Sequence, residues 1–304
     1  MSMSITITKP GFMCSIQDLG RRGYQEYGIP ISGAMDMQAA VTANRICGND
    51  DGDALLECTL HGTEILIHHT TVFSITGGGS IATVNGQLIP YNKLIKAIAG
   101  SIIKLLPSPI GFYTYLAFAG GLKTSLELGS SSTYKLASLG GINGKTIEQD
   151  DLIELKHPNN KLHHANIVLN EHGFGISNWK SSVPALPHVN DVVAIKCYKG
   201  PEWDLFDERS AFAWFNTIFT ISQHANRMGF QLEGAQLHKR EKKEMISTAV
   251  TKGIVQVTNQ GTPIVLMADA QTIGGYPRIA RIVNEDINLL AQCRPGTKIQ
   301  FILF

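Results

Sequence analysis

Short runs of β-branched and apolar residues, each ended by glycine, proline or asparagine, recur along almost the whole chain. Residues 63–76 (TEILIHHTTVFSIT), 112–118 (FYTYLAF), 192–198 (VVAIKCY) and the closing KIQFILF are typical of β-strands. Asn85-Gly86 between two apolar runs predicts a hairpin, and residues 253–268 predict another that turns at 259–261. These strands do not alternate regularly with helices, which disfavours a doubly wound parallel sheet. We therefore expect a mostly-β chain, built as barrels with a few covering helices.

Three segments are expected to form those helices. Residues 36–47 begin with an aspartate and end before Gly48, and residues 284–293 begin with asparagine and acidic residues and end before Pro295-Gly296. Residues 203–215 carry large apolar side chains at mostly helical spacing.

The composition excludes several classes of protein. With 43% hydrophobic and 17% charged residues the chain can build a substantial core, and its net charge of +1 gives no electrostatic footprint for nucleic acid or an anionic membrane. Its five cysteines form no CxxC pair, so neither a disulfide framework nor a zinc site is predicted. The N-terminus lacks signal-peptide features and no run of about 18 apolar residues occurs. We expect a cytoplasmic protein with no membrane segment and no bound metal.

The chain is expected to contain two halves. Residues 156–189 are rich in Asn, His, Ser and Pro and are predicted to connect an N-terminal subdomain (1–155) with a C-terminal one (190–304), although short strands could lie inside the connection or interleave between the halves. A faint repeat supports two halves, because residues 21–25 (RRGYQ) and 227–231 (RMGFQ) both read R-x-G-aromatic-Q.

Familiar catalytic motifs are missing. GGINGKT (140–146) resembles a phosphate-binding loop, but only three residues separate Gly140 from the Gly-Lys-Thr, where the motif needs four, so an ordinary turn is predicted. Neither GxSxG nor HExxH occurs, and the neighbours His68 and His69 should point to opposite faces of a strand. No nucleophile–base set is evident.

Three stretches instead combine glycines with arginine, aromatic and amide or carboxylate side chains: residues 17–36 (QDLGRRGYQEYGIPISGAMD), 226–234 (NRMGFQLEG) and 271–280 (QTIGGYPRIA). Each has a purely structural interpretation, namely a surface loop, an Arg–Glu pair across a turn and the end of a strand. Together they favour recognition of a small polar or anionic substrate, because such sites are built on loops that a rigid β scaffold holds.

The same stretches, with ANRICGNDD, LLECTLHG and LGSSSTYKLASLGG, are similar in order to the motifs of the allophanate hydrolase subunit 2 family. This biotin-dependent carboxyltransferase-like family includes KipA and the C subunit of 5-oxoprolinase (PxpC), and the resemblance extends from about residue 10 to 296. It implies two cyclophilin-like β-barrel subdomains and a subunit-1-type partner (PxpB- or KipI-like). Three positions depart from the family: Ser131 and Asn226 replace a common Arg and Asp, and Arg22 replaces a frequent Pro.

The resemblance implies three alternative functions. The first is that of the C subunit in an ATP-dependent 5-oxoprolinase complex, with a third PxpA-like subunit, that cleaves 5-oxoproline to glutamate; its ATP site would be shared with or lie on another subunit. The second is the carboxyltransferase subunit of urea amidolyase, which alone would use biotin, and the third is a KipA-type regulator that antagonises a histidine-kinase inhibitor.

For the first function we assign site residues from their chemistry. Arg227 and Arg278 are expected to bind an anion or oxyanion, while Gln271 and Tyr276 orient the ring. Gly274 and Gly275 would let the backbone approach a ligand, and the remaining substrate-binding residues are expected to be Asp18, Arg21, Tyr24, Ser32, Asp36, Glu57 and Thr272.

Overall fold

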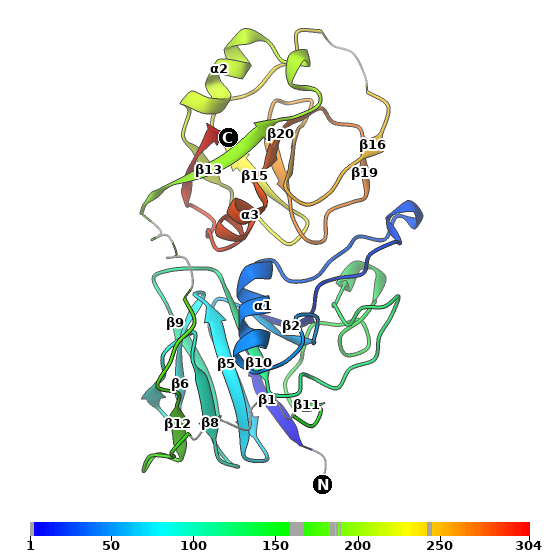
Figure 1. Ribbon diagram of the computed structural model, residues 1–304. Coiled ribbons are helices and arrows are strands. Elements are labelled where there is room, and N and C mark those ends of the chain that lie inside the picture. The colour runs from blue at the N-terminus through cyan, green and yellow to red at the C-terminus, as the bar shows by residue number, and fades with distance from the viewer. Residues whose placement is uncertain (1–2, 159–166, 183–185, 187, 189, 242–244) are drawn as a thin grey trace. The chain divides into compact units, whose positions relative to one another are not determined.

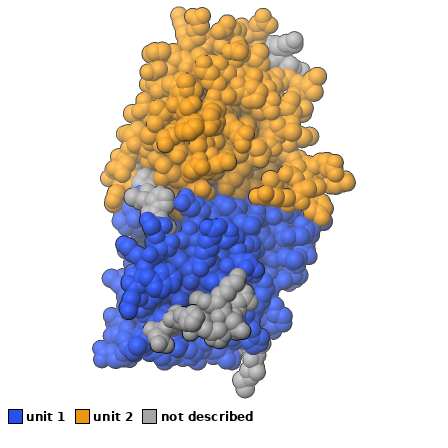
Figure 2. Space-filling view, viewed as in Figure 1, with its two compact units in different colours: residues 1–21, 32–186 blue, residues 22–31, 187–304 orange. Residues whose placement is uncertain are grey.

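The computed structural model describes residues 3–158, 167–182, 186, 188, 190–241 and 245–304. Two compact units are present: unit 1 comprises residues 1–21 and 32–186, and unit 2 comprises residues 22–31 and 187–304 (Figure 2). The described residues form many strands and three α-helices, so the prediction of a mostly-β chain with few helices is confirmed (Figure 1).

Unit 1 contains two six-stranded sheets. The first has the order β11 (Asp151–Glu154), β1 (Ser4–Pro10), β4 (Thr63–Ile67), β9 (Ile102–Pro107), β6 (Ser80–Val84) and β7 (Gln87–Leu88). The second has the order β12 (Phe174–Ile176), β8 (Leu94–Ala97), β5 (Thr71–Gly77), β10 (Tyr113–Phe118), β3 (Leu55–Thr59) and β2 (Met13–Gln17). Side chains from both sheets, such as Ile65, Ile103, Leu56 and Phe118, are fully buried in one core.

Helix α1 (Met37–Ile46) covers strands β5 and β10 of the second sheet (Figure 1). As predicted, Asp36 caps its N-terminus, accepting a hydrogen bond from the Ala39 N–H at 3.0 Å. The hydroxyls of Ser74 and Thr76 on β5 donate to carbonyls of the helix at 2.7 Å each. These polar side chains are buried under the helix because the helix supplies their acceptors.

The hairpin predicted at Asn85-Gly86 is confirmed between β6 and β7. Both residues have positive φ, 51° and 83°, which is the backbone of a tight two-residue turn. Asn and Gly tolerate this conformation, so the turn is determined locally by the sequence.

Unit 2 is built around a closed seven-stranded barrel (Figure 1). Its strands follow one another in the order β13 (Val192–Lys199), β20 (Arg278–Ile282), β17 (Ile254–Val257), β18 (Pro263–Leu266), β15 (Gly229–Glu233), β14 (Phe219–Ile221) and β21 (Lys298–Leu303). The hairpin predicted within 253–268 joins β17 to β18. Stacked aromatic rings of Trp214 and Phe301, 3.9 Å apart between centroids, lie in the interior with Phe219.

Several boundaries differ from the sequence expectations. The helix expected over 203–215 is divided into a short 3-10 turn η4 (Trp203–Leu205) and α2 (Glu208–Asn216), because Asp207 caps a new helix there. In the third helix, α3 (Asn284–Ala291), Val283 occupies the N-cap position without a side-chain hydrogen bond, and the asparagine is the first helical residue. The first copy of the R-x-G-aromatic-Q repeat lies in a loop up to its glutamine, which begins a 3-10 turn, whereas the second runs into β15.

The division between the halves also differs. Residues 22–31, which contain the 3-10 turn η1 (Gln25–Tyr27), group with unit 2, although they lie inside the sequence of the expected first half. Within the expected connection, residues 159–166 lie outside the described part of the chain, and Phe174–Ile176 forms β12, which pairs with β8 in the second sheet. The segment therefore contributes to a sheet and does more than connect.

Smaller elements complete the chain. Strands β16 (Thr248–Ala249) and β19 (Ile273–Gly274) pair beside the barrel, and η2 (Lys135–Ala137) is a 3-10 turn of unit 1. All five cysteines are buried free thiols. Among the described residues, no helix combines the length and apolar character needed to cross a membrane, and no cluster of His, Cys, Asp and Glu is arranged to hold a metal.

Candidate functional site

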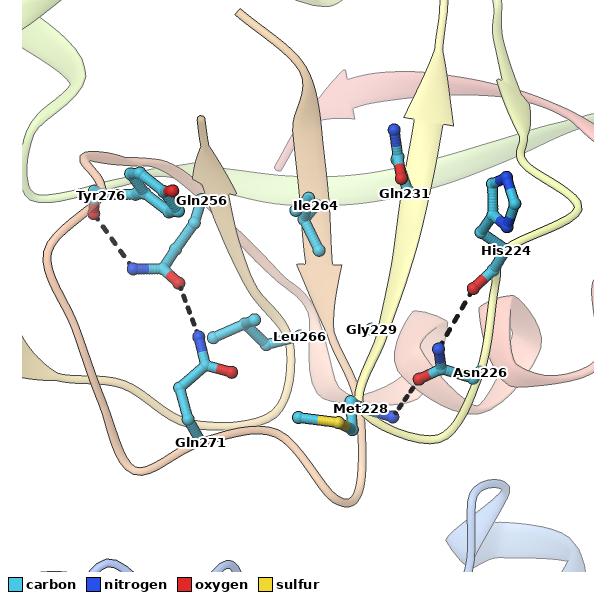
Figure 3. Close-up of a pocket in the computed structure, with 10 residues that line it drawn as sticks. All are labelled: His224, Asn226, Met228, Gly229, Gln231, Gln256, Ile264, Leu266, Gln271 and Tyr276. Carbon is cyan, nitrogen blue, oxygen red and sulfur yellow. Dashed lines mark hydrogen bonds between the residues drawn. The ribbon is translucent and has the colours of Figure 1, made fainter. Parts of the chain in front are cut away.

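A pocket of about 300 Å³ lies over one face of strands β15, β18 and β17 of unit 2. Cross-strand pairing places Gln231, Ile264 and Gln256 in one row on this face. The neighbouring Phe230 and Val265 point the opposite way and are fully buried. The pocket is completed by loops, and its lining consists of His224, Asn226, Met228, Gly229, Gln231, Gln256, Ile264, Leu266, Gln271 and Tyr276 (Figure 3).

The pocket is polar but almost uncharged. Four of the ten lining residues carry amides, and none is Asp, Glu, Lys or Arg. His224 is exposed and is the one imidazole among the lining side chains. Apolar surface comes from Met228, Ile264 and Leu266. Such a lining complements the neutral amide-like groups of a small ligand better than a group that carries several charges.

Gln256 is the buried centre of a chain of hydrogen bonds along one wall. Its Nε2 donates to the Tyr276 carbonyl at 3.1 Å, and its Oε1 accepts from the Gln271 amide at 3.2 Å (Figure 3). Only 2% of Gln256 is exposed. Gln271 and Tyr276, both expected at the site, are thus brought together by a residue that the sequence analysis missed.

Gly274 makes room for this amide. A Cβ atom built on Gly274 would lie 2.6 Å from the Gln256 Nε2, whereas one on Gly275 would have its nearest neighbour, the Ser247 hydroxyl, at 3.5 Å. At Gly275 no protein atom comes as close, so the expected approach of a ligand there stays a prediction. The close approach occurs at Gly274, and what approaches is a protein side chain.

The turn before β15 is stabilised by Asn226, the residue that replaces a common Asp. Its Nδ2 donates to the His224 carbonyl at 3.1 Å, and its Oδ1 accepts from the Met228 N–H at 2.8 Å. A carboxylate could make the second bond but not the first. The departure from the family pattern therefore leaves this wall of the pocket intact.

Arg227 lies between two lining residues yet turns to Asp269. Its Nε and one terminal nitrogen donate to the two carboxylate oxygens at 2.8 and 3.0 Å, and both side chains are only 11% exposed. Such a bidentate pair fixes the guanidinium. Arg227 therefore has a structural partner within the protein, and its expected role as a ligand for a substrate anion stays a prediction.

Arg278 is held in the same way by Glu202. Its Nε and one terminal nitrogen donate to the carboxylate at 2.7 and 2.6 Å, and the other terminal nitrogen donates to the Ala249 carbonyl at 3.1 Å. These bonds hold the pKa of Glu202 below its usual value. Arg278 therefore ties β16 and the η4 turn to the barrel, and its expected role as an anion ligand stays a prediction.

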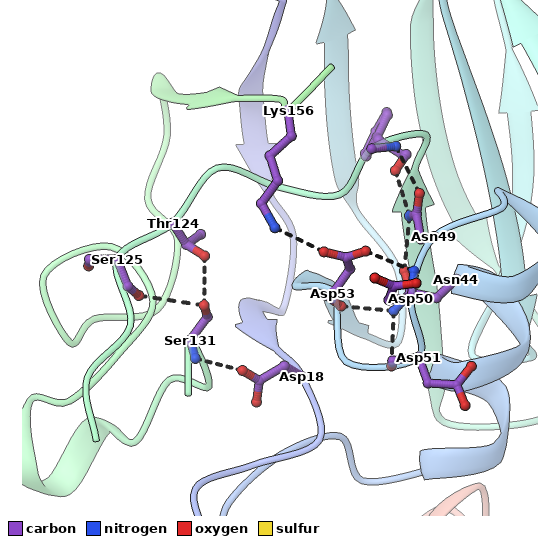
Figure 4. Close-up of polar contacts among 12 residues, drawn as sticks. Asp18, Asn44, Asn49, Asp50, Asp51, Asp53, Thr124, Ser125, Ser131 and Lys156 are labelled. Carbon is purple, nitrogen blue, oxygen red and sulfur yellow. Dashed lines mark hydrogen bonds and ion pairs between the residues drawn. The ribbon is translucent and has the colours of Figure 1, made fainter. Parts of the chain in front are cut away.

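In unit 1, Asp18 is the acceptor of a compact serine cluster. One of its oxygens accepts from the Gly20 N–H at 2.7 Å, the Ser130 hydroxyl at 2.6 Å and the Ser132 hydroxyl at 2.5 Å. The other oxygen accepts from the Ser131 N–H at 2.6 Å (Figure 4). Asp18 is 8% exposed. It orders the loops after β2 and before the η2 turn, so its expected role in binding substrate has no support from its contacts.

The neighbouring predicted residues are also buried. Arg21 is 1% exposed and donates to the Ser132 carbonyl, and Ser32, 3% exposed, has a φ of 57°. Ser131, which replaces the family's common Arg, bonds through its hydroxyl to the Thr124 hydroxyl at 2.7 Å (Figure 4). Nearby, Lys156 forms an ion pair with Asp53 at 2.9 Å.

Glu57 and Asp36 belong to a network that fixes the start of α1. One Glu57 oxygen accepts from the Tyr115 hydroxyl at 2.8 Å and from the Met35 N–H at 2.7 Å, while the Asp36 N–H donates to the Tyr115 oxygen at 2.7 Å. Burial raises the pKa of Tyr115 well above its ordinary value. Both carboxylates therefore have structural roles in unit 1.

The two remaining predicted residues do not line the pocket of unit 2. Thr272 is 7% exposed, and its carbonyl accepts from the Val250 N–H at 2.9 Å. Tyr24 caps the η1 turn in the segment that groups with unit 2. Of the residues expected at the site, only Gln271 and Tyr276 line this pocket, with Gly274 directly behind Gln256.

Sequence reasoning assigned only two of the ten lining residues, and four of the others, His224, Gln256, Ile264 and Leu266, lie outside all three stretches that it singled out. One signal was available, because Gln256 interrupts the apolar run of a buried strand (IVQV). A polar residue in such a position must find hydrogen-bond partners, which commonly lie at a functional site.

Comparisons with known proteins agree with this architecture. Residues 27–303 match the family described as "Carboxyltransferase domain, subdomain A and B". The chain is 33% identical to the C subunit of 5-oxoprolinase from Escherichia coli over 298 residues, which cover 98% of this chain and 90% of that protein. It is 29% identical to urea amidolyase of Saccharomyces cerevisiae over 98% of its own length, but spans only 16% of that protein.

The fold is shared with a solved structure. The urea carboxylase of Kluyveromyces lactis superposes with a TM-score of 0.89 at 27% identity. All of this chain is covered, whereas the match spans 27% of the urea carboxylase chain. The chain thus corresponds to nearly the whole of one kind of relative and to a fraction of the other.

Proposed function

The chain belongs to the carboxyltransferase domain family of subdomains A and B, and we propose that it acts as the C subunit of a 5-oxoprolinase complex. In this role it takes part in opening the lactam ring of 5-oxoproline to give glutamate, coupled to ATP hydrolysis. The observation that carries the proposal is the match to the 5-oxoprolinase C subunit along 98% of this chain and 90% of the relative.

The chemistry of the pocket supports the same function. A lactam is a neutral ring with one N–H donor and one carbonyl acceptor, and the amides of Gln231 and Gln271 can complement both. Ile264 and Leu266 offer apolar surface to the ring methylenes. The substrate carboxylate would have His224 as its cationic partner when that imidazole is protonated.

ATP does not fit this pocket. A triphosphate requires several cationic side chains or a cradle of backbone N–H groups, and the lining contains no Lys or Arg. The GGINGKT segment forms turns with no helix behind it. We therefore propose that the ATP site is shared with or lies on another subunit, either a PxpB- or KipI-like partner or a third PxpA-like subunit, and that this chain binds the ring.

Reconstitution tests the proposal. The chain is co-expressed and purified with the subunit-1-type and third subunits of its own organism, and glutamate formation from 5-oxoproline is measured with and without ATP. We expect glutamate only when all subunits and ATP are present. Equal activity of the mixture without this chain, or no glutamate from an assembled complex, would reject it.

Carboxyl transfer to urea is the second candidate, and the likeness to urea carboxylase favours it. Urea and the ureido ring of biotin are also neutral amide-like groups that the pocket could hold. The discriminating measurement is the loss of label from a carboxybiotinylated carrier protein on addition of urea. Discharge that depends on urea and on this chain, with no glutamate formed from 5-oxoproline, would favour the carboxyltransferase.

A further inference from the structure

A backbone carbonyl determines which groups donate and which accept in the hydrogen bonds along the pocket wall. The Tyr276 carbonyl oxygen can only accept, so the Gln256 group that faces it must be the NH₂. The Gln256 oxygen then faces Gln271, which must in turn present its own NH₂. Because Tyr276 contributes a backbone atom that cannot change character, the orientation of both side-chain amides is fixed without reference to any ligand.

Gln271, Gln256 and the Tyr276 carbonyl form a hydrogen-bonded relay. Packing keeps its middle member, Gln256, in place. Gln256 is 2% exposed, and its terminal amide occupies the space that a Gly274 side chain would take. A flipped Gln256 would direct its oxygen at the Tyr276 carbonyl and its NH₂ at the NH₂ of Gln271. Both hydrogen bonds of the buried amide would be lost and like groups would face each other in their place, so the flipped state is disfavoured.

The far end of the relay points into the pocket. With its NH₂ held by Gln256, the oxygen of Gln271 is directed away from Gln256, toward the side of the pocket where Leu266 and Met228 lie (Figure 3). On the opposite side, Asn226 uses its amide in the turn between His224 and Met228. Gln271 therefore offers the pocket a hydrogen-bond acceptor of fixed direction.

We propose that Gln271 is a specificity-determining residue that selects ligands with an unsubstituted amide N–H, and that Gln256 positions it. This proposal rests on the proposed function in taking the pocket as the site of a neutral amide. When the ligand fills the pocket, the Gln271 oxygen loses contact with water. A ligand with N–H restores a hydrogen bond there, whereas an N-alkylated ligand leaves a desolvated acceptor unpaired.

A matched pair of small lactams tests the proposal directly. Binding of 2-pyrrolidone and N-methyl-2-pyrrolidone to the intact chain is measured by ligand-observed NMR titration, and the ratio of their dissociation constants is the readout. For the wild-type chain we expect 2-pyrrolidone to bind about 10- to 100-fold more tightly. Equal affinities, or no binding of either lactam at millimolar concentrations, would overturn the proposal.

Three variants separate the relay from general damage to the pocket. Gln271→Leu removes the acceptor and Gln256→Leu removes its positioning, so both should bring the ratio toward one. Gln231→Leu removes an amide that lines the same pocket outside the relay, so it should change both affinities together and leave the ratio unaltered. Thermal unfolding establishes that each variant is folded. An unchanged ratio in folded Gln256→Leu would overturn the positioning role.

The outcome is independent of the catalytic assay. If N–H selectivity is found but the reconstituted complex forms no glutamate, the proposed function fails and the relay stands. If glutamate is formed while the two lactams bind equally, the relay fails and the function stands. Gly274→Ala gives a further check, because its Cβ would displace Gln256 and should lower the ratio as Gln256→Leu does.

Discussion

Arg278 offers the sharpest test of the structural roles, because sequence and structure assign it different ones. In the structure its guanidinium makes two hydrogen bonds to Glu202 and one to the Ala249 carbonyl, with the side chains of the ion pair 18% and 15% exposed. We expect Arg278→Ala to destabilise the protein by removing this clamp. If Arg278 instead bound only the substrate, the same variant would lose activity and keep its stability.

The size of the stability loss follows from the Glu202 carboxylate, which Arg278→Ala leaves without its partner. Removing one partner of a well-buried pair costs about 3–5 kcal/mol, and one charge-assisted hydrogen bond is worth about 1.5–3 kcal/mol. Residual exposure lets water reach the Glu202 carboxylate, so we expect a loss of about 2–3 kcal/mol in the free energy of unfolding. For a unit of this size that lowers the Tm by about 5–15 °C.

Arg281 provides the matched control, since it lies on the same strand and is exposed. Arg281→Ala should change the stability by no more than about 0.5 kcal/mol. The assay is thermal unfolding of both variants, with Glu202→Gln and the double variant completing a double-mutant cycle. If Arg278→Ala melts like Arg281→Ala while glutamate formation is lost, the clamp is refuted and the role of anion ligand returns.

The pH dependence gives a second readout of the same pair. The pKa of Glu202 is lower in the folded protein than in the unfolded chain, because Arg278 donates hydrogen bonds to its charged form. The pair therefore contributes its full stability above the unfolded pKa of about 4.3 and loses it as the pH falls through the folded pKa. The stability difference between wild type and Arg278→Ala should accordingly shrink below about pH 4.

Three further outcomes are expected. Tyr115→Phe, which removes the phenolic link between Glu57 and the Asp36 N–H, should lower the unfolding free energy by about 1–3 kcal/mol in denaturant titrations; a loss below about 0.5 kcal/mol would contradict the network. Gly140→Ala should lower the unfolding free energy clearly more than Gly129→Ala in the same titrations. Both glycines have positive φ, but only a Cβ at Gly140 would meet a carbonyl oxygen, at 2.1 Å. Equal losses of about 1 kcal/mol would show that backbone strain alone matters. All five cysteines should resist a thiol reagent at pH 8 until the chain unfolds, because they are buried; rapid modification of any of them in the native state would disprove this.

The sequence by itself determined the features that depend on neighbouring residues. The mostly-β class follows from β-branched runs divided by turn residues, the β6–β7 hairpin from Asn85-Gly86, and the start of α1 from Asp36. Each of these depends on backbone preferences or hydrogen bonds within a few residues. Such interactions are available to any chain with that local sequence, so they can be predicted without the fold.

Only the tertiary structure decided what the conspicuous arginines do. Arg227 meets Asp269 from 42 residues away, and Arg278 meets Glu202 from 76 residues away. An arginine beside glycines has the same sequence signature whether its partner is a ligand or a distant carboxylate, because the partner is brought to it by strand pairing. The same holds for Gln256, whose amide reaches Gln271 and the Tyr276 carbonyl where the fold places it against Gly274, a residue without a side chain.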